Sequence, residues 1–380
     1  MTLPSFRVDV QISTHQEGAE QYLVLHDPFG IADGPIMLHA DMIDILSVCD
    51  GETTIDQLAV LAGVATDGPE IMQIRMFIAE LDTMGYFEGD RADALRQKAI
   101  EEWNALPTRP PICAGSTYPQ DPDELRSFLA GFEVEVLEPA SAAPTMVLLP
   151  HIDFRVAPHV YGQAYSHIRS SDADLVVMIG TSHYWDGHPI IVTNKPFETP
   201  LGVVPVIEHP FHEPLADIAH KPEHSLELHV VLLQHLWGSR PFEILPILVT
   251  QSVFDIENLE KISREIQEFV ASTNRKVLWL ISGDLAHIGR KFGDELPASM
   301  LVDGVRTADQ ALVNALEDNN LAQYRACIDA HGNQYRVCGY APTVLAHAAR
   351  PVGRGRAIAY DVWDEIETQS AVSFATIIWD

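Results

Sequence analysis

The chain is poor in basic residues and has no long hydrophobic run. Across its 380 residues, 24 lysines and arginines stand against 54 aspartates and glutamates, a formal net charge of −30. Such a charge repels a phosphate backbone, so no nucleic-acid partner is expected. No apolar run approaches the roughly 20 residues needed to cross a bilayer, and the first residues lack the features of a secretory signal. We therefore expect no membrane partner and a cytoplasmic location.

Cysteine is also scarce, and several catalytic motifs are missing. The four cysteines, Cys49, Cys113, Cys327 and Cys338, form no CxxC pair. A zinc knuckle or disulfide framework is therefore not indicated, and reduced thiols are expected. The GxSxG elbow, the GxxxxGK[ST] phosphate loop and a strand-linked GxGxxG are absent, which disfavours a serine hydrolase and nucleotide binding. Histidine, by contrast, occurs 17 times, often directly after an apolar run.

Length and composition fit two globular domains. The chain is longer than one typical domain, and 47% hydrophobic and 21% charged residues are ordinary values for folded protein. A charged helix is expected from Arg91 to about Leu106. The Pro-rich stretch Pro107 to Pro111 ends it, because proline cannot continue a helix. We predict a first domain over residues 1–106 and a second over residues 107–380.

The first domain shows helical patterns between His39 and Glu88. Apolar residues recur at helical spacing over residues 42–49, and Thr54 with Gln57 has the spacing of a capping box at the start of a second helix. A third helix is expected from about Pro69 to Met84, where a glycine follows. These features predict a small helical domain.

The stretches DGETTIDQLAVLAG and FIAELDTMGYFEG resemble small winged-helix modules that bind leader peptides, such as the chaperone of pyrroloquinoline quinone biosynthesis. The apolar pair Tyr86-Phe87 would contribute to the wing. A helical adaptor that packs on its own catalytic domain is an equal alternative. DNA binding is disfavoured because Asp67 and Glu70 lie in the recognition region with Arg75 as the only nearby base.

The second domain alternates short apolar runs with helical patterns. Runs that are apolar on both faces are typical of buried strands, so we predict an α/β fold with a central sheet flanked by helices. The expected strands are residues 146–149, 175–179, 244–249, 277–281 and, last, 372–379. The expected helices include residues 257–270 and 306–328.

Three of these strands end in polar clusters. They are Pro150-His151-Ile-Asp153, Gly180-Thr-Ser-His183 and Ser282-Gly-Asp284-Leu-Ala-His287. One strand-end histidine is more often a hydrogen-bonded structural residue. Three in one domain favour a shared site, because the carboxyl ends of neighbouring strands meet at one edge of the sheet. Imidazoles are common ligands of iron, copper and zinc.

A fourth cluster, Glu223-His224-Ser-Leu-Glu227-Leu-His229, precedes an apolar helix. It is not the metalloprotease HExxH motif, because its two histidines are five residues apart. Helical spacing would place Glu223 and Glu227 on one face, where they could support ligands or act as a base. The alternative is a solvated helix start with acids favoured by the dipole. Cys338, before a glycine, is by itself more often a buried apolar residue than a ligand.

These motifs resemble, in order and spacing, those of the Memo family, also called AmmeMemoRadiSam system protein B. The matching stretches are Arg109 to Tyr118, His151, Thr181-Ser-His183, Glu223 to Glu227, Ser282 to His287 and Val337-Cys338-Gly339. The resemblance implies a fold similar to class III extradiol dioxygenases, with a metal bound by His151, His183 and Cys338. The residues His224, Asp284 and His287 would line the same pocket.

Two positions depart from the family pattern. The family usually has His-Ala-Gly-Tyr where this chain has His151-Ile-Asp153-Phe154, and often His-His where it has His183-Tyr184. A carboxylate and a phenol are therefore expected near the site. Substrate and metal choice would differ accordingly.

Three functions follow as hypotheses. In the first, iron or copper held by two histidines and a thiolate supports dioxygenase-like redox chemistry on a small molecule or peptide, with His287 or His224 as acid/base and Asp284 orienting a histidine. In the second, zinc activates water for hydrolysis, with Glu227 or Asp284 as base. In the third, the protein is not an enzyme and binds a modified peptide or a radical S-adenosylmethionine (radical SAM) partner, which the family association suggests.

Overall fold

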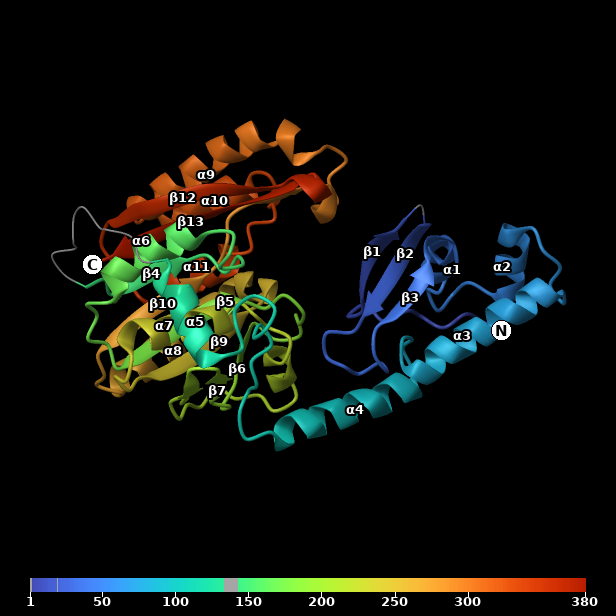
Figure 1. The fold of residues 1–380 in the computed structure, drawn as a ribbon, viewed down its shortest axis with the longest axis horizontal. Helices are drawn as coiled ribbons and strands as arrows, with labels where there is room; N and C mark the ends of the chain where they lie inside the picture. Colours follow the sequence, from blue (N-terminus) through green and yellow to red (C-terminus); the bar gives the residue numbers. More distant parts are fainter. Residues whose placement is uncertain (1, 19, 133–142) are drawn as a thin grey trace. The chain divides into compact units, whose positions relative to one another are not determined.

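The computed structural model describes residues 2–18, 20–132 and 143–380, and the chain separates into two compact units. The first unit is Met1–Leu106 and the second is Pro107–Asp380 (Figure 1). Each has a hydrophobic core of its own. No helix of the described residues is long and apolar enough to span a bilayer.

The first unit begins with a three-stranded antiparallel sheet that the sequence analysis did not predict. Its strands are β1 (Gln11–Glu17), β2 (Glu20–His26) and β3 (Ile36–His39), in that order across the sheet. The helices α1 (Ile43–Ser47), α2 (Ile55–Ala62), α3 (Pro69–Met84) and α4 (Asp90–Ala105) follow. The description of this unit as a helical domain is therefore incomplete.

The helix boundaries in the first unit follow local rules. Thr54 and Gln57 form the predicted capping box at the start of α2, and α3 ends at Gly85, which adopts the left-handed conformation. The winged-helix prediction is not confirmed. Its expected wing at Tyr86-Phe87 contributes only an isolated bridge, between Phe87 and Phe6.

The second unit is built on a mixed sheet, which confirms the α/β prediction. In the described part of the chain the sheet has eight strands in the order β11-β13-β4-β10-β5-β9-β6, with β12 also paired to β13. The four central strands are parallel: β4 (Met146–Leu149), β10 (Val277–Ser282), β5 (Leu175–Thr181) and β9 (Glu243–Val249). The similarity to extradiol dioxygenases stays a prediction.

The outer strands run antiparallel to their neighbours. They are β6 (Ile190–Val192), β13 (Ser370–Trp379), β12 (Gly355–Glu365) and β11 (His287–Gly289). A separate hairpin consists of β7 (Phe197–Thr199) and β8 (Gly202–Val204). Residues before β11 are also tied to β13, because Leu285 N–H donates to the Ser373 carbonyl and Ser373 N–H donates to that of Ala286.

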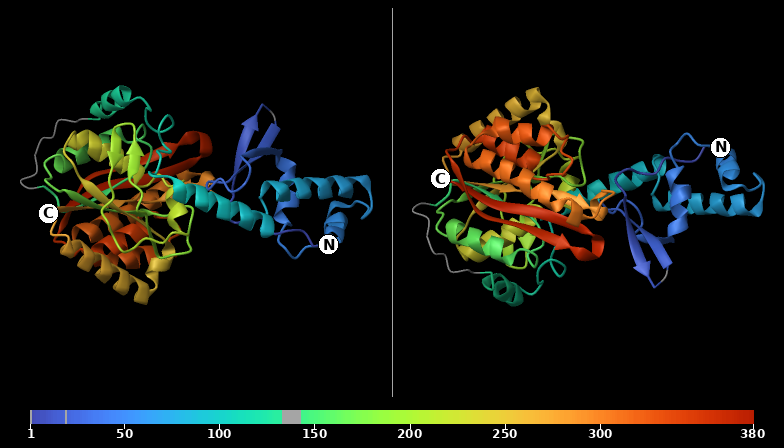
Figure 2. Two further views of the ribbon diagram at one scale, coloured as in Figure 1. Left: turned by 90° about the horizontal axis from the view of Figure 1, so that it is seen from below. Right: turned by 90° about the horizontal axis from the view of Figure 1, so that it is seen from above.

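Two layers of helices cover the sheet, because the central strands are apolar on both faces. Val147 and Leu149 of β4 pack in one core with α5 (Pro122–Ala130), α6 (Pro158–Ile168) and α7 (Glu227–Trp237). Met146 and Leu148 pack in the other with α8 (Ile256–Ser272), α9 (Val302–Glu317), α10 (Leu321–Asp329) and α11 (Tyr340–Ala349). Figure 2 shows the two layers of helices on opposite faces of the sheet.

The predicted helix over residues 306–328 is in fact two helices. Asn319 has a positive φ of 52°, which breaks the helical path after α9. Asn320 then caps α10, because its side chain accepts a hydrogen bond from the Gln323 N–H. Apolar periodicity alone did not reveal this break. The short 3-10 helices are Ala40–Met42, Asp217–His220, Gln251–Phe254, Arg290–Phe292, Ala298–Met300 and Ile366–Thr368.

A buried ion pair links the start of the second unit to α7. The Arg109 guanidinium bonds the carboxylate of Glu227, and it also donates to the carbonyls of His220 and Glu223. The side chains of Arg109 and Glu227 are 1% and 0% exposed. Removing one partner would leave a charge buried without compensation.

Arg109→Met should therefore lower the free energy of unfolding by about 3–5 kcal/mol. The matched control is Arg126→Met, which removes an ion pair with Asp123 whose side chains are 55% and 93% exposed. The control should change stability by less than about 0.5 kcal/mol. Urea unfolding of both variants measures this, and equal effects would contradict an anchoring role for Arg109.

Candidate metal centre

The polar clusters after β4, β10 and β5 meet because these three strands are adjacent and parallel. A close contact between two backbone segments brings a further residue, Cys338, to this site. A Cβ on Gly283, just after β10, would lie 2.3 Å from the Cα of Gly339. Only glycine permits this approach, which brings the segment that carries Cys338 against the end of β10.

His151 occupies the buried side of the site and is 3% exposed. Its Nδ1 lies 3.0 Å from the Ser282 Oγ, and the His229 Nε2 lies 3.0 Å from the same oxygen. The Ser282 hydroxyl donates its single proton to the Ser225 carbonyl at 2.6 Å, so both imidazoles must donate to it. His151 therefore carries its proton on Nδ1 and presents an Nε2 lone pair to the site.

His183 and His224 form the open side of the site and share the carboxylate of Glu223. The His183 Nδ1 lies 2.9 Å from Glu223 Oε1, and its backbone N–H donates to Oε2 at 2.8 Å. The His224 Nδ1 is 3.4 Å from Glu223 Oε1. A carboxylate only accepts, so His183 keeps a proton on Nδ1, and only the neutral form of the ring has a lone pair on Nε2. About a quarter of the His183 side chain is exposed.

The three imidazole rings lie close together: those of His183 and His224 are stacked, and that of His151 is edge-on to both. Their centroids are 5.1 Å apart for His151 and His183, 5.2 Å for His151 and His224, and 4.9 Å for His183 and His224. Burial lowers the pKa of His151 well below its ordinary value and that of His224 to about 4. Both rings are therefore neutral at pH 7, which is the form that binds a metal.

The charges of Glu223 and His183 support each other. Burial alone would raise the pKa of the Glu223 carboxyl, but His183 and its hydrogen bonds hold it well below its usual range. Burial would likewise lower the pKa of His183, and the Glu223 charge outweighs this and raises it. Glu223 is therefore an anionic support for the exposed imidazole.

Cys338 and Asp284 also lie beside His151. The Cys338 Sγ is 3.4 Å from the His151 Nε2, and it accepts a hydrogen bond from the Asp284 N–H at 3.2 Å. Asp284 accepts from the His151 N–H, and its Oδ2 is 3.7 Å from the His151 Nε2. Burial raises the pKa of the Cys338 thiol well above its ordinary value and that of Asp284 to about 7.

Two groups of residues could each hold a metal ion within the described chain, and they share His151. The first is His151, His183 and His224, and the second is His151, Asp284 and Cys338. The ligand atoms within each group lie within 4.8 Å of one another. The expected ligands are thus divided between the groups, since His183 belongs to the first and Cys338 to the second.

The prediction that Glu223 and Glu227 share a helix face is wrong, because α7 begins only at Glu227. Glu223 lies in the turn before it and points to the histidines. The Glu227 carboxylate instead accepts from Arg109, from the Ile112 and Cys113 N–H groups and from the Tyr118 hydroxyl. These four donors occupy its oxygens, which fits an anchor better than a base.

The remaining predicted residues lie at the margin of the cluster. His287 begins β11, and its Nδ1 lies 3.0 Å from the Arg336 carbonyl, while burial lowers its pKa to about 4. The Asp153 carboxylate bonds to Arg155. Burial and the Glu223 charge raise the pKa of Tyr184 to about 12, so its phenol stays protonated at neutral pH.

Sequence reasoning missed the supporting roles of Ser282 and His229. Both are 0% exposed, and they join β10 to α7 directly beneath His151. Nothing in the sequence distinguishes this serine from others at strand ends. The spacing of His229 bears only on the metalloprotease motif, whereas its partner Ser282 is 53 residues away in the sequence.

These features define an α/β protein with a histidine, cysteine and carboxylate cluster at the carboxyl edge of its central strands. The family model described as Memo-like protein matches residues 109–378, so the chain belongs to this family. A MEMO1 family protein of Aquifex aeolicus is 29% identical over 374 residues, covering 94% of this chain and 95% of the relative. One of Archaeoglobus fulgidus is 27% identical over 281 residues, covering 71% and 99%.

The lengths of these alignments differ in an informative way. The Archaeoglobus alignment covers 71% of this chain, which is about the length of the second unit alone. The Aquifex alignment covers 94% of this chain, so it must include most of residues 1–106 as well. The first unit therefore also has a counterpart in the Aquifex relative.

The raised pKa of Asp284 predicts how stability depends on pH without metal. Between its unfolded value and about 7, the carboxyl stays protonated in the folded state but ionises in the unfolded state, so stability falls as pH rises through this window. From pH 5 to pH 8 the loss due to Asp284 should be on the order of 2 kcal/mol.

Asp284→Asn removes this titration while keeping an oxygen to accept from His151. The variant should gain stability over wild type as pH rises, measured by urea unfolding of chelator-treated protein at pH 5 and pH 8. A constant difference at the two pH values would refute the assignment.

Proposed function

We propose that this protein is a metal-dependent oxidoreductase of dioxygenase type, which uses iron or copper and acts on a small molecule or peptide. One observation carries the proposal. Hydrogen bonds to Ser282 and Glu223 occupy the Nδ1 atoms of His151 and His183, which leaves the Nε2 atom of each ring for a ligand bond, and the Cys338 Sγ lies 3.4 Å from the His151 Nε2. Supporting partners that fix imidazole tautomers are typical of metal ligands.

The residues present fit a transition ion. In this proposal His151, His183 and Cys338 hold it, which requires His183 and Cys338, members of different groups, to approach one ion. Metal binding would also release the proton that burial keeps on the thiol. A thiolate is softer than a carboxylate, which favours iron or copper over magnesium. Bound there, the ion would supply open positions for substrate and dioxygen. His224 is the rival third ligand, since it lies in one group with both histidines.

Three residues have proton-transfer roles in this proposal. His224, a third exposed, can exchange a proton with a substrate at the open side. Asp284, whose pKa burial raises to about 7, can hold or release a proton near neutral pH. His287, with its Nδ1 directed to the Arg336 carbonyl, offers its other nitrogen as an acid or base.

A zinc-dependent hydrolase is the second candidate. Three imidazole ligands and one open position are a recurring arrangement in catalytic zinc sites, and His151, His183 and His224 form a group that could hold a metal. Asp284 would then be the base. Glu227, the other base considered, is less suited because four donors already occupy it.

A non-enzymatic role as a peptide-binding or partner-binding protein is the third candidate, with a radical SAM protein as the partner. The presence of the first unit in the Aquifex relative supports it, because a unit with its own core adds a surface beyond the cluster. In all three cases the four free cysteines are consistent with a reducing cytoplasm.

Elemental analysis of protein purified without oxygen tests the proposal directly. Wild type should contain about one iron or copper per chain, and His151→Ala, His183→Ala and Cys338→Ala should each lose most of it, because each removes a ligand. The control is His159→Ala, an exposed histidine paired with Asp361 away from the cluster, which should keep its metal.

Each other outcome has a defined meaning. Zinc without oxygen consumption would replace the proposal by the hydrolase. Loss of metal in His224→Ala but not in Cys338→Ala would make the imidazole group the site. Wild-type protein that contains no metal would favour the third candidate, the non-enzymatic role as a peptide-binding or partner-binding protein.

Ser282→Ala should weaken metal binding by about 10- to 100-fold without removing a ligand, because His151 loses the acceptor that fixes its tautomer. Competition with a chromophoric chelator measures the affinity. Ser263→Ala is the control, since this buried serine bonds only within α8. Equal affinities in the two variants would show that Ser282 does not position His151.

A further inference from the structure

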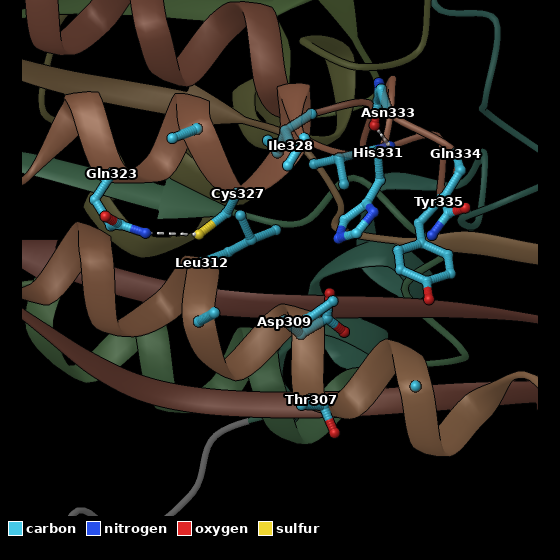
Figure 3. Close-up of a pocket in the computed structure, with 16 residues that line it drawn as sticks. Thr307, Asp309, Leu312, Gln323, Cys327, Ile328, His331, Asn333, Gln334 and Tyr335 are labelled. Carbon is cyan, nitrogen blue, oxygen red and sulfur yellow. Dashed lines mark hydrogen bonds between the residues drawn. The ribbon is translucent and has the colours of Figure 1, made fainter.

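A separate pocket lies between α9, α10 and the segment of residues 330–337 (Figure 3). Its volume is about 490 Å³, which is within the range of small-molecule sites. None of His151, His183, His224, Asp284 or Cys338 lines it. It is therefore distinct from the metal cluster.

One end of the pocket is apolar. Leu312 of α9 and Cys327 of α10 lie close together at this end, and the Cys327 thiol lies between the helices (Figure 3). Ala308, Ala326 and Ile328 also line the pocket. The Cys327 thiol already accepts a hydrogen bond from its own helix, from the side chain of Gln323. Apart from the Gln323 amide, which bonds to Cys327, this end offers an occupant an apolar contact surface.

The other end carries polar groups from the segment after α10. The His331 imidazole and the side chains of Gln334 and Tyr335 line it, and none of these three side chains makes a hydrogen bond to another described residue. Figure 3 shows His331 directed into the pocket from this segment. An occupant with a hydrogen-bonding end would find donors and acceptors here.

Charge complementarity excludes strongly ionic occupants. No lysine or arginine lines the pocket, so a full anion has no partner there, and the net charge of −30 adds repulsion. Among the described residues, Asp309 is the only acidic one that lines the pocket, and it is 1% exposed with its carboxylate accepting from the Tyr360 hydroxyl. Little of that charge is available to a cation.

We propose that this pocket binds a neutral, mostly apolar small molecule with one hydrogen-bonding end. The apolar body would lie between Leu312 and Ala326, and the polar end would meet His331 and Tyr335.

The position of the pocket gives an occupant contact with the backbone behind the cluster. Val337 lines the pocket and directly precedes Cys338. The carbonyls of Tyr335 and Arg336 accept from the backbone N–H and from the Nδ1 of His287. An occupant would thus touch the segment that positions two residues of the neighbouring cluster, although its binding requires no metal.

The test uses three probes with one bicyclic body and different heads: 2-naphthylmethanol, 2-naphthoate and 2-naphthylmethylammonium. Calorimetric titration of the full chain should show the alcohol binding at least about ten-fold more tightly than either ion, since neither charge has a free partner. Tyr335→Phe should weaken binding of the alcohol about five-fold, the ratio expected for one ordinary hydrogen bond.

Ala326→Trp should fill the pocket and weaken binding of the alcohol at least ten-fold. Its matched control is Ala322→Trp, an exposed alanine one turn earlier on α10 that does not line the pocket. Equal binding to these two variants, tighter binding of either ion, or no binding of the alcohol to folded wild type would each overturn the proposal. If Ala326→Trp fails to fold, Tyr335→Phe decides.

Discussion

The arrangement of the cluster depends on the buried guanidinium of Arg109. It donates to two backbone carbonyls within residues 220–227 and to the carboxylate that begins α7. The segment that it holds carries Glu223, and Glu223 in turn orients His183 and stands beside His224. A charge outside the cluster thereby sets the positions of two of its rings. Because the pair is buried, this positioning is insensitive to salt.

The site combines a rigid buried side with an accessible one. His151 is held from below by Ser282, whose hydroxyl also joins β10 to α7. His183 and His224 are partly exposed and have a single carboxylate as their common support. The His151 ring is fixed by its buried hydrogen bond, whereas the rings of His183 and His224 are in contact with solvent and accessible to a substrate. The pocket between α9 and α10 is connected to the cluster through the backbone segment of residues 330–337, which directly precedes Cys338.

The sequence predicted the parts of the fold that depend on local pattern. The strand over residues 146–149 was placed correctly because a short run that is apolar on both faces is typical of a strand buried between two layers, and the same pattern placed the strand-end clusters. The sheet of the first unit was missed because β1 is exposed along its length and lacks an apolar face. Glu227 was misjudged because its partner Arg109 is 118 residues away, and no spacing rule reveals such a contact.

The pairing of β13 has a consequence for biosynthesis. This strand, residues 370–379, fills the place beside β4 and holds the segment between Asp284 and His287 through Ser373. A ribosome-bound chain that has not yet reached β13 lacks this support, although its four parallel strands are already complete. The cluster is therefore finished late in translation, while the hydrophobic core of the first unit consists of residues that are all synthesised before the second unit begins.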